Sequence, residues 1–480
     1  MSPPTVPVIR STKIVATLGP ASSDPAVLER MIVAGVDVVR LNFSHARRAQ
    51  MVRDICRKVG RTVGIMADLQ GPKIRVGKFK DGKVQLERGA EFVLDSDCEL
   101  GDATKVGIDY KELPRDVRPA DVLLLDDGRI AFAVIRVVGD SVHCSVRHGG
   151  MLSNNKGINR LGGGLTAPAL TPKDMEDIRT ATKINADFLA VSFPKSGRDM
   201  YLAGELMRAA GGKALLIAKI ERAEAVVPAA LEDILSACDG IMVARGDLAV
   251  EVGDASVPSL QKRMIRLARE RNKLTITATQ MMESMIASPI PTRAEVSDVA
   301  NAVLDGTDAV MLSAETASGA YPVETIESMS RICSVAEQSA PVSLDREFLD
   351  RVFTRVDQSI AMAALFTAYH LKVKAIASLT ESGSTALWIS RLNCGVPVYA
   401  LTSQTSTRYR CSLFRDTYPL PMRHVGHDRE ELLAEAEQVL VDNGVAKDGD
   451  IIVVTFGEPI GKSGGTNTMK IVKIGEHRKP

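Results

Sequence analysis

The segment ALLIAKIE, residues 214–221, ends an apolar, β-prone run with two polar side chains, Lys219 and Glu221. Two later segments, GIMVARGD at 240–247 and KLTITAT at 273–279, have the same design. The polar residues in each are spaced by two, and residues two apart lie on one face of a strand. The segments follow one another at roughly 30 residues, the spacing of successive strands in a (β/α)8 barrel, whose catalytic residues gather at the carboxyl ends. The pattern predicts an enzyme built on such a barrel.

The composition is that of an ordinary globular protein with several domains. The 480 residues are 45% apolar and 25% charged, and this length accommodates about three domains. The formal net charge of +1 gives no reason to expect nucleic acid or an anionic membrane as a partner. Seven cysteines without a C-x-x-C pair are typical of reduced thiols, and the start lacks the apolar stretch of a signal peptide. We therefore expect a cytoplasmic protein without a membrane span.

Eight barrel strands are expected, most of them followed by a helical pattern. Two of the helices begin with capping boxes, Thr171-x-x-Asp174 and Thr292-x-x-Glu295. The expected strands are Lys13–Thr17, Val38–Asn42, Gly64–Asp68, Phe188–Ser192, Leu215–Lys219, Gly240–Ala244, Thr275–Thr279 and Ala309–Leu312, and helical patterns include Ala26–Ala34, Pro172–Ile184 and Pro258–Arg271.

One interval breaks the rhythm of the barrel. About 120 residues separate the third expected strand from the fourth, where a βα unit averages ~30. The excess is rich in turns such as Asp81-Gly82 and Asp127-Gly128, which predict a small all-β domain inserted after the third strand. Two chain crossings would join this domain to one face of the barrel, which is the position of a lid.

After Pro341 the alternation of strands and helices restarts and predicts a doubly wound α/β domain. The expected division is 1–71 and 169–342 for the barrel domain, 72–168 for the inserted lid and 343–480 for the C-terminal domain. In the last of these the expected elements are a helix at Val356–Leu371, a helix at Ala386–Leu392, and strands at Ala375–Leu379, Val396–Leu401, Ile451–Phe456 and Lys470–Ile474.

Glu221 and Asp247 are candidate ligands of a divalent metal. Two carboxylates on neighbouring strand ends make the few-ligand, water-rich site that Mg²⁺ prefers, with substrate phosphates completing the octahedron. The alternative is a salt-bridge network with Lys219, Arg222 or Arg245, which the residues alone favour about equally. Lys219, at the end of an apolar strand, is by position more often an ion-pair partner than a catalytic group.

The second and third strands end in groups that suit phosphates and cations. Arg40, Asn42 and Ser44 alternate onto one face, and Asp68 ends the third strand. Arginine is the planar donor for phosphate, and the Asn, Ser and Asp oxygens are of the kind that alkali cations bind. His45 alone carries little information.

Two loops of the C-terminal domain invite an anion-binding interpretation. Gly457–Ser463 looks like a P-loop, but three residues separate its glycines where a Walker A motif has four, so we reject it. The segment TESGST, residues 380–385, lies between a strand and a helix, and its small residues and free N–H groups predict an anion pocket. Most segments of this kind are only helix caps, and that alternative stays open.

Taken together, these motifs resemble pyruvate kinase over essentially the whole chain. The resemblance implies a TIM barrel with an inserted small β-barrel lid domain and a C-terminal α/β regulatory domain. Seven strings that occur in the family's order carry it: TKIVATLGPAS (12–22), RLNFSH (40–45), GPKIR (71–75), KIER (219–222), RGD (245–247), TATQMMES (277–284) and VMLSAET (310–316).

The resemblance implies the glycolytic transfer of a phosphoryl group from phosphoenolpyruvate to ADP, followed by protonation of enolpyruvate. Mg²⁺ or Mn²⁺ on Glu221 and Asp247 would hold the substrate carboxylate and enol oxygen, and Lys219 would stabilise the moving phosphoryl group and the enolate. The other implied roles are phosphate positioning by Arg40 and Arg75, binding of the substrate carboxylate by Gly246, Asp247 and Thr279, proton delivery by Thr279 with Ser313 and Glu315 behind it, and nucleotide-side contacts by Thr17, Pro20, Asn42, His45, Arg75 and Asp126 in the lid.

Lys73 departs from the pattern that the resemblance implies. Many family members carry Glu there and depend on K⁺ bound by the equivalents of Asn42, Ser44, Asp68 and the next carbonyl, that of Leu69. The Lys73 ammonium would take the place of K⁺, so we predict a K⁺-independent enzyme. The short connection after His45 is a second departure.

The resemblance also implies a regulated homotetramer. Thr380, Ser382, Gly383, Ser384 and Thr385 are expected to bind the phosphate of an activator. Groups that would hold a second phosphate are not evident at 457–468, so a sugar monophosphate or AMP is expected rather than fructose 1,6-bisphosphate.

Two other functions are compatible with parts of the pattern. A Mg²⁺-dependent barrel lyase or aldolase acting on pyruvate-type enolates would use the same two carboxylates but would not need the lid. A metabolite-sensing scaffold with a decayed site would show losses at Lys219, Glu221 or Asp247, and all three are present.

Overall fold

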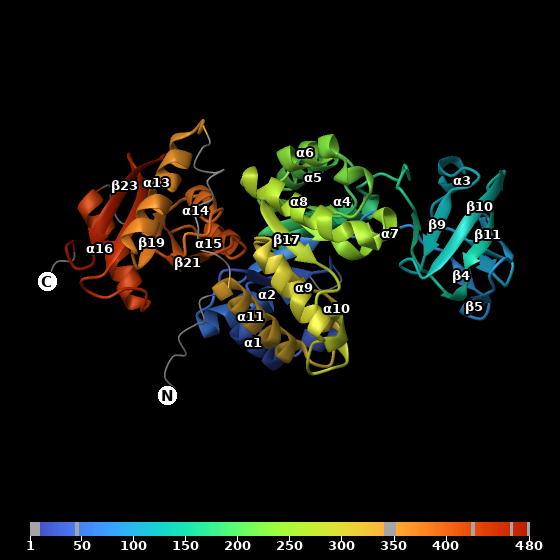
Figure 1. The fold of residues 1–480 in the computed structure, drawn as a ribbon, viewed down its shortest axis with the longest axis horizontal. Coiled ribbons are helices and arrows are strands. Elements are labelled where there is room, and N and C mark those ends of the chain that lie inside the picture. Colours follow the sequence, from blue (N-terminus) through green and yellow to red (C-terminus); the bar gives the residue numbers. More distant parts are fainter. Residues whose placement is uncertain (1–9, 44–47, 340–351, 424–427, 461–463, 478–480) are drawn as a thin grey trace.

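The computed structural model describes residues 10–43, 48–339, 352–423, 428–460 and 464–477 (Figure 1). Eight parallel strands form a closed barrel in the order β1-β18-β17-β16-β15-β14-β3-β2, which confirms the expected (β/α)8 architecture. All eight strands lie where they were expected, with ends that shift by at most one residue: β1 (Lys13–Thr17), β2 (Val38–Leu41), β3 (Gly64–Asp68), β14 (Phe188–Val191), β15 (Leu215–Ile220), β16 (Gly240–Ala244), β17 (Leu274–Ala278) and β18 (Ala309–Leu312).

Helices surround the barrel, and local signals explain where they begin. Both expected capping boxes form, because the Thr171 and Thr292 hydroxyls accept from the backbone N–H groups of Asp174 and Glu295. None of the described helices is long and apolar enough to cross a bilayer. The helices are α1 (Pro25–Ala34), α2 (Arg48–Val59), α4 (Pro172–Lys183), α5 (Gly197–Ala209), α6 (Pro228–Ala237), α7 (Arg245–Val252), α8 (Val257–Glu270), α9 (Arg293–Leu304), α10 (Ala314–Ala317) and α11 (Pro322–Ser339).

The insertion after β3 is built almost wholly of strands, as expected. It was expected as a small β-barrel; its strands form a six-stranded sheet in the order β13-β9-β10-β11-β6-β8 and two two-stranded sheets, β12-β5 and β4-β7. Its elements are β4 (Lys78–Phe79), β5 (Lys83–Leu86), β6 (Glu91–Asp95), β7 (Leu100–Gly101), β8 (Lys105–Gly107), α3 (Leu113–Asp116), β9 (Val122–Leu125), β10 (Ile130–Val138), β11 (Ser141–His148), β12 (Gly150–Ser153) and β13 (Ile158–Arg160).

The C-terminal domain is a five-stranded sheet in the order β21-β20-β19-β22-β23 with helices against it. Its strand β21 was not expected, because Pro419 and Pro421 argue against a strand; β21 lies at the edge of the sheet, where proline is tolerated. The last strand begins earlier than expected. The elements are α13 (Val356–Leu371), β19 (Ala375–Leu379), α14 (Ser384–Ile389), β20 (Val398–Thr402), α15 (Thr405–Cys411), β21 (Thr417–Pro421), α16 (Arg429–Asp442), β22 (Ile451–Gly457) and β23 (Thr466–Lys473).

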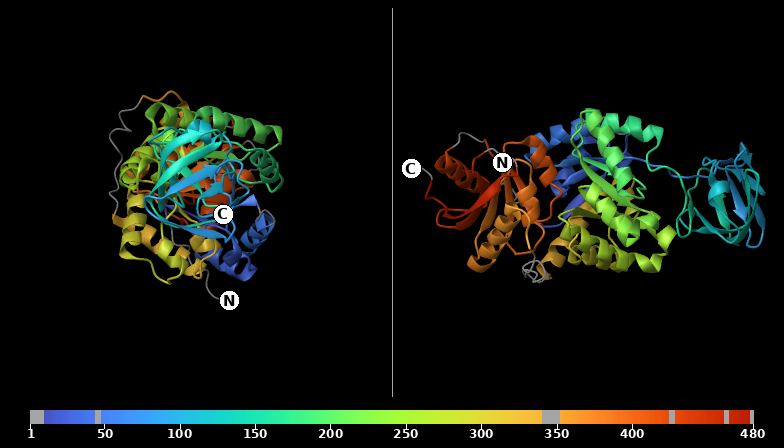
Figure 2. Two further views of the ribbon diagram at one scale, coloured as in Figure 1. Left: turned by 90° about the vertical axis from the view of Figure 1, so that its right-hand side faces the viewer. Right: turned by 90° about the horizontal axis from the view of Figure 1, so that it is seen from above.

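The insertion and the C-terminal domain lie on opposite sides of the barrel (Figures 1 and 2). The insertion leaves from the carboxyl end of β3. The C-terminal domain packs on the other face, where barrel-interior side chains such as Phe188 and Leu274 share one core with Leu365 and Phe414. This arrangement leaves the carboxyl ends of the strands facing the insertion.

Candidate active site at the carboxyl ends of the barrel strands

Lys219 is the centre of a buried charge cluster at the end of β15. Its ammonium lies 2.9 Å from Glu221 Oε1 and 3.5 Å from Asp68 Oδ1, and it donates a hydrogen bond of 2.7 Å to Ser192 Oγ. Burial disfavours the Lys219 charge, but the Asp68 and Glu221 carboxylates outweigh burial and raise the pKa of the ammonium. A fixed positive charge therefore persists at this point of the barrel.

The two carboxylates of the cluster differ in their environment. Burial raises the pKa of Glu221, the Lys219 charge opposes this, and the like charge of Asp247 adds to it. Burial also acts on Asp68, but the Arg40 and Lys219 cations hold the pKa of that carboxyl below its usual range. Glu221 Oε2 accepts a hydrogen bond of 2.9 Å from the backbone N–H of Phe193. The neighbouring cations thus favour the charged form of Asp68, whereas burial and the nearby Asp247 disfavour the charged form of Glu221.

Arg40 joins the cluster from β2. Its Nε forms an ion pair with Asp68, and its Nη1 donates to Thr17 Oγ1 at 3.2 Å. The Thr17 hydroxyl donates in turn to the Leu312 carbonyl at 2.8 Å. Adjacent strand ends are therefore tied together through a guanidinium that is only partly buried.

The loop after β17 is held in a strained conformation next to the start of α7. Thr279 and Gln280 have φ values of 65° and 54°, which β-branched Thr rarely adopts. The Arg245 guanidinium donates to the Thr279 carbonyl at 2.7 Å and forms two 2.7 Å contacts with Asp298. Gly246 N–H donates to Thr279 Oγ1 at 2.8 Å. Arg245 therefore pairs with Asp298, not with the candidate metal carboxylates.

Glu315 ties the end of β18 to the same loop. This buried carboxylate accepts a hydrogen bond of 2.7 Å from Ser313 N–H and one of 3.2 Å from Met282 N–H. Thr316 Oγ1 donates to the Thr17 carbonyl at 2.9 Å. Glu315 therefore lies next to the loop that follows β17, and its role and that of Ser313 in proton delivery stay predictions.

Lys73 and the candidate metal carboxylate Asp247 meet where the insertion leaves the barrel. The Lys73 ammonium lies 3.4 Å from Asp247 Oδ1, and these side chains are 30% and 23% exposed. This ion pair is with Asp247 rather than with Asp68, so the replacement of K⁺ by the Lys73 ammonium stays a prediction. The contact shows that the lysine reaches the mouth of the barrel from the insertion side.

The two predicted nucleotide-side residues of the insertion lie beside the segment 155–157. Arg75 Nη1 donates to the Asn155 carbonyl at 2.9 Å, and Asp126 N–H donates to the Gly157 carbonyl at 3.2 Å. The Asp126 carboxylate is paired with Lys156 at 2.6 Å. The structure therefore groups Arg75 and Asp126 within the insertion and does not bring them into the Lys219 cluster.

The remaining predicted residues have fewer contacts with the Lys219 cluster or lie outside the described residues. Asn42 and Pro20 are exposed at the ends of the strands. The Leu69 side chain is buried, and its carbonyl accepts a hydrogen bond of 2.7 Å from Ser192 Oγ. Ser44 and His45, with the short connection that follows them, lie outside the described residues.

Ser192, Asp298 and Arg245 were not predicted as members of the site, although each contacts a predicted residue. Ser192 ends an expected strand, so its position at the carboxyl end of β14 was a usable signal. The ion pair of Arg245 with Asp298 on α9 could not be predicted from the sequence, because the two residues are far apart in the chain and meet only through the packing of α9.

Glu251 on α7 connects the barrel to the insertion. Its buried carboxylate accepts a hydrogen bond of 2.8 Å from Ala223 N–H and one of 3.5 Å from Asn159 Nδ2. Its carbonyl accepts one of 2.9 Å from Gly162 N–H. Burial raises the pKa of Glu251 to about 7, although the Ala223 hydrogen bond opposes the shift. A carboxyl that titrates near neutrality therefore lies at the hinge of the insertion.

Glu251→Gln is expected to stabilise the protein at pH 8 and to change nothing near pH 4. Because the pKa is raised in the folded protein, the wild type loses stability as the pH rises from about 4.5 to about 7 and the loss is complete above that. A shift of this size corresponds to about 3 kcal/mol. Melting temperatures of the variant and the wild type across this range check the prediction, with the exposed Glu176→Gln as control. A difference that does not vary with pH would contradict it.

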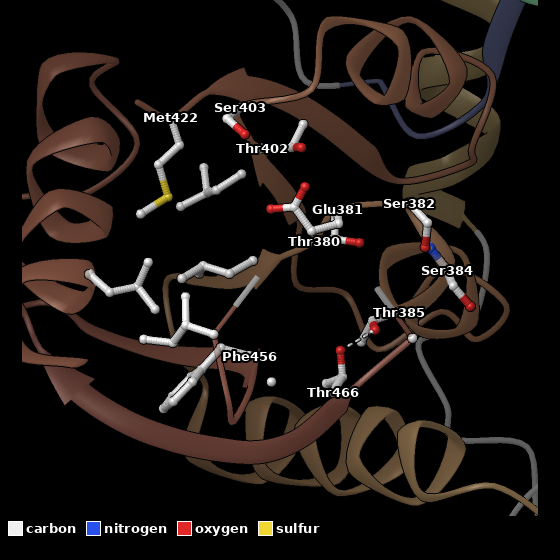
Figure 3. A pocket seen from close by; sticks show the side chains of 16 residues that line it. Thr380, Glu381, Ser382, Ser384, Thr385, Thr402, Ser403, Met422, Phe456 and Thr466 are labelled. Carbon is white, nitrogen blue, oxygen red and sulfur yellow. Dashed lines mark hydrogen bonds between the residues drawn. The ribbon is translucent and has the colours of Figure 1, made fainter. Parts of the chain in front are cut away.

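The predicted anion-binding segment lies in the wall of a pocket of the C-terminal domain (Figure 3). Gly383 N–H donates to Thr380 Oγ1 at 2.8 Å, and the Thr385 and Thr466 hydroxyls are 2.7 Å apart. The Glu381 side chain also lines the pocket. Among the described residues of its lining there is no lysine or arginine. The pocket is polar at this end and apolar opposite, at Met422 and Phe456.

Comparisons with known proteins cover nearly the whole chain. A family model described as pyruvate kinase, barrel domain, matches residues 9–326, and one described as pyruvate kinase, alpha/beta domain, matches residues 358–472. Pyruvate kinase II of Salmonella typhimurium is 52% identical over 97% of this chain and 99% of its own length. The pyruvate kinase of Haemophilus influenzae is 51% identical over 94% and 96%, and that of Corynebacterium efficiens 42% over 97% and 98%. The chain belongs to the pyruvate kinase family.

Proposed function

We propose that this enzyme transfers the phosphoryl group of phosphoenolpyruvate to ADP around the Lys219 charge cluster. The observation that carries the proposal is the buried ammonium of Lys219, held by Glu221, Asp68 and Ser192. In the reaction the bond between phosphorus and the enol oxygen breaks, a bond to the β-phosphate oxygen of ADP forms, and the enolate left behind takes a proton at its methylene carbon. Negative charge develops on the enol oxygen, and a preorganised cation stabilises it.

The charged residues of the cluster would divide the work. Lys219 stabilises the phosphoryl group in transfer and the enolate, while Arg40 holds a phosphate with the free part of its guanidinium. Thr17, Pro20, Asn42, His45, Arg75 and Asp126 are the proposed contacts on the nucleotide side. Because Arg75 and Asp126 lie in the insertion, its movement toward the barrel would complete the nucleotide site and exclude water.

The loop after β17 would bind the carboxylate of the substrate. Gly246 N–H and Thr279 Oγ1 are 2.8 Å apart, and both would turn to the substrate carboxylate, together with Asp247 N–H. Thr279 then stands on the route of the proton to the enolate, with Ser313 and Glu315 behind it. The network from Arg245 and Glu315 fixes this loop, which keeps the hydroxyl in place during the reaction.

Glu221 and Asp247 are the residues that would hold a divalent metal, Mg²⁺ or Mn²⁺. Their fit is electrostatic, because the proximity of Asp247 adds to burial in raising the Glu221 pKa, and a dication relieves this repulsion. The described residues contain no group of three or more His, Cys, Asp or Glu side chains placed for a metal. Two carboxylates suit a cation that keeps water and substrate oxygens in its shell. When bound, the metal would supply charge neutralisation at the substrate oxygens.

Glu221→Gln is expected to raise the Mg²⁺ concentration needed for half-maximal activity by more than about tenfold, the lower end of the effect of losing even an outer-sphere partner. The amide keeps the hydrogen bond from Phe193 but removes the negative charge. Titration of activity and of Mn²⁺ binding with metal measures the change, with Glu176→Gln as control. An unchanged metal requirement would remove Glu221 from the site.

Regulation and assembly are the finer parts of the proposal. We infer that Thr380, Ser382, Gly383, Ser384 and Thr385 bind the phosphate of a sugar monophosphate or of AMP. Among the described residues that line the pocket there is no lysine or arginine to hold a second phosphate, which argues against fructose 1,6-bisphosphate. Exposed apolar side chains on α13 and β23, such as Phe366 and Ile471, support assembly of the C-terminal domains into a homotetramer.

The proposed domain division remains that of residues 1–71 with 169–342, 72–168 and 343–480, and the proposed location is the cytoplasm. A coupled assay of pyruvate formation from phosphoenolpyruvate and ADP tests the central function. Pyruvate must appear only when ADP and Mg²⁺ are both present. Release of pyruvate without ADP would instead support lyase chemistry.

A further inference from the structure

Asp308 is a buried carboxylate that immediately precedes β18, on the barrel face opposite the candidate active site. It forms a bidentate ion pair with Arg391 of the C-terminal domain, and both side chains are 1% exposed. Its carboxylate also accepts hydrogen bonds from the backbone N–H groups of Arg415, at 3.1 Å, and Thr275, at 2.9 Å. One carboxylate therefore joins the two domains through several directional contacts.

Arg391 connects Asp308 to one wall of the C-terminal pocket. It follows α14, a helix of six residues whose Thr385 lines the pocket. Arg391 Nε donates to the Leu387 carbonyl at 3.2 Å, so the guanidinium is fixed to the end of α14. A displacement of α14 therefore moves the group that holds Asp308.

Arg415 connects Asp308 to the same pocket by a second route. The Thr407 hydroxyl on α15 donates to the carbonyl of Glu381, a pocket residue, at 2.6 Å. Arg415 follows α15, donates to Asp308 from its backbone, and donates from Nη1 to the Thr307 carbonyl at 2.9 Å. Both helices that contact the segment 380–385, α14 and α15, are thus connected to the Asp308 carboxylate.

Asp308 in turn contacts the amino-terminal ends of β1, β17 and β18. Its N–H donates to Thr275 Oγ1 at 3.0 Å, and its carbonyl accepts from Lys13 N–H at 2.8 Å. From there β17 leads to Thr279 and β18 leads to Ser313. Strands of four or five residues span only about 15 Å. The contacts of Asp308 therefore lie one strand length from the proposed substrate-binding loop.

We propose that Asp308 is a positioning residue that couples the C-terminal pocket to the carboxyl ends of β17 and β18. The proposal rests on the proposed effector function of that pocket. A buried bidentate ion pair keeps its geometry and does not deform gradually. A movement of α14 or α15 is therefore passed through Asp308 to the amino-terminal ends of β17 and β18. Ligand in the pocket then changes the position of Thr279 and with it the KM for phosphoenolpyruvate.

The test compares Asp308→Asn and Arg391→Lys with the wild type, using the full-length enzyme. Arg410→Gln is the matched control, because the Arg410 guanidinium donates to the Lys213 carbonyl elsewhere on the same domain interface. Glucose 6-phosphate and AMP are the probes. The fluorescence of Trp388, the one tryptophan of the sequence and a residue of α14, reports binding to the pocket.

In the wild type the effective probe is expected to lower the KM for phosphoenolpyruvate by at least about fivefold. In Asp308→Asn the probe concentration that gives half of the Trp388 fluorescence change should stay within about threefold of the wild-type value, and so should kcat. The probe should then lower the KM for phosphoenolpyruvate by less than about twofold. Arg410→Gln should keep the full shift. A role of Asp308 in stability alone would lower the melting temperature and leave the KM shift intact. Arg391→Lys decides the question if Asp308→Asn does not fold.

The outcomes separate the coupling from the effector site. A full KM shift in Asp308→Asn or Arg391→Lys overturns the coupling and leaves the effector site standing. Loss of the KM shift in the control Arg410→Gln, in addition to its loss in these two variants, has the same consequence. A wild type that binds a probe without any KM shift overturns the coupling in the same way. A wild type in which neither probe changes Trp388 fluorescence or KM refutes the proposed effector function, and the coupling falls with it.

Discussion

Lys219→Met is expected to lower kcat by roughly 10³-fold. The ammonium is the cation that the structure holds between Glu221 and Asp68, 2.9 Å and 3.5 Å away, and those carboxylates keep it protonated. Methionine fills a similar volume without charge, so it removes the electrostatic stabilisation of the transferring group and of the enolate. Charge fixed in a buried site costs no reorganisation during the reaction, which is why its loss acts mainly on kcat.

Metal binding distinguishes this catalytic role from a structural one. Removal of a cation 2.9 Å from Glu221 makes the neighbourhood of that carboxylate more negative, so Mn²⁺ should bind the variant at least as tightly as the wild type. Asp68 keeps Arg40, and Glu221 keeps the hydrogen bond from Phe193. The expected result is a loss of turnover with retained metal affinity, measured by the coupled assay and by Mn²⁺ titration.

Lys213→Met is the matched control for this variant. Lys213 precedes the same strand, is exposed, and lies at the opposite end from Lys219. It should keep wild-type kcat. A variant at position 219 that loses Mn²⁺ affinity in proportion to kcat would show that Lys219 only maintains the metal carboxylates.

The barrel could be predicted from the sequence because each of its strands is a short apolar run ended by polar residues. Burial on both faces makes such strands almost continuously apolar. The strand ends in the structure differ from the predicted ends by at most one residue. Strand β21 was not predicted, because its two prolines are tolerated only at the edge of a sheet. Which strand lies at the edge is known only from the assembled sheet.

The candidate site was predictable where two residues of one strand end face the same way. Lys219 and Glu221 are an example, since spacing by two brings them within 2.9 Å. The choice of partners across strands was not predictable. Arg245 pairs with Asp298 on α9, and Asp308 pairs with Arg391 of another domain, because packing decides which opposite charge comes within reach.

We predict that the wild type does not need K⁺ and that Lys73→Glu creates a requirement for it. In the wild type we predict that activity in KCl and in tetramethylammonium chloride of equal ionic strength agrees within about twofold, because the Lys73 ammonium supplies a positive charge at the mouth of the barrel, 3.4 Å from Asp247 Oδ1. Glutamate replaces this positive charge with a negative one. Two unit charges about 4 Å apart at an effective dielectric constant of 20 interact by about 4 kcal/mol. The partial exposure of Lys73 weakens the effect, so we expect a loss of roughly 100-fold without K⁺.

Recovery of activity in KCl is the decisive part of this prediction. A new carboxylate at the mouth of the barrel, with the oxygens of Asn42, Asp68 and Leu69 as the proposed further ligands, would make a site to which a monovalent cation returns the missing charge. Lys78→Glu, a charge reversal at an exposed lysine of β4, controls for the general effect of negative charge on the insertion. If Lys73→Glu stayed inactive at every K⁺ concentration, Lys73 would act through Asp247 alone. Strong activation of the wild type by K⁺ would show that the ammonium does not stand in for the ion, and the oxygens near Asp68 would then still need their own cation.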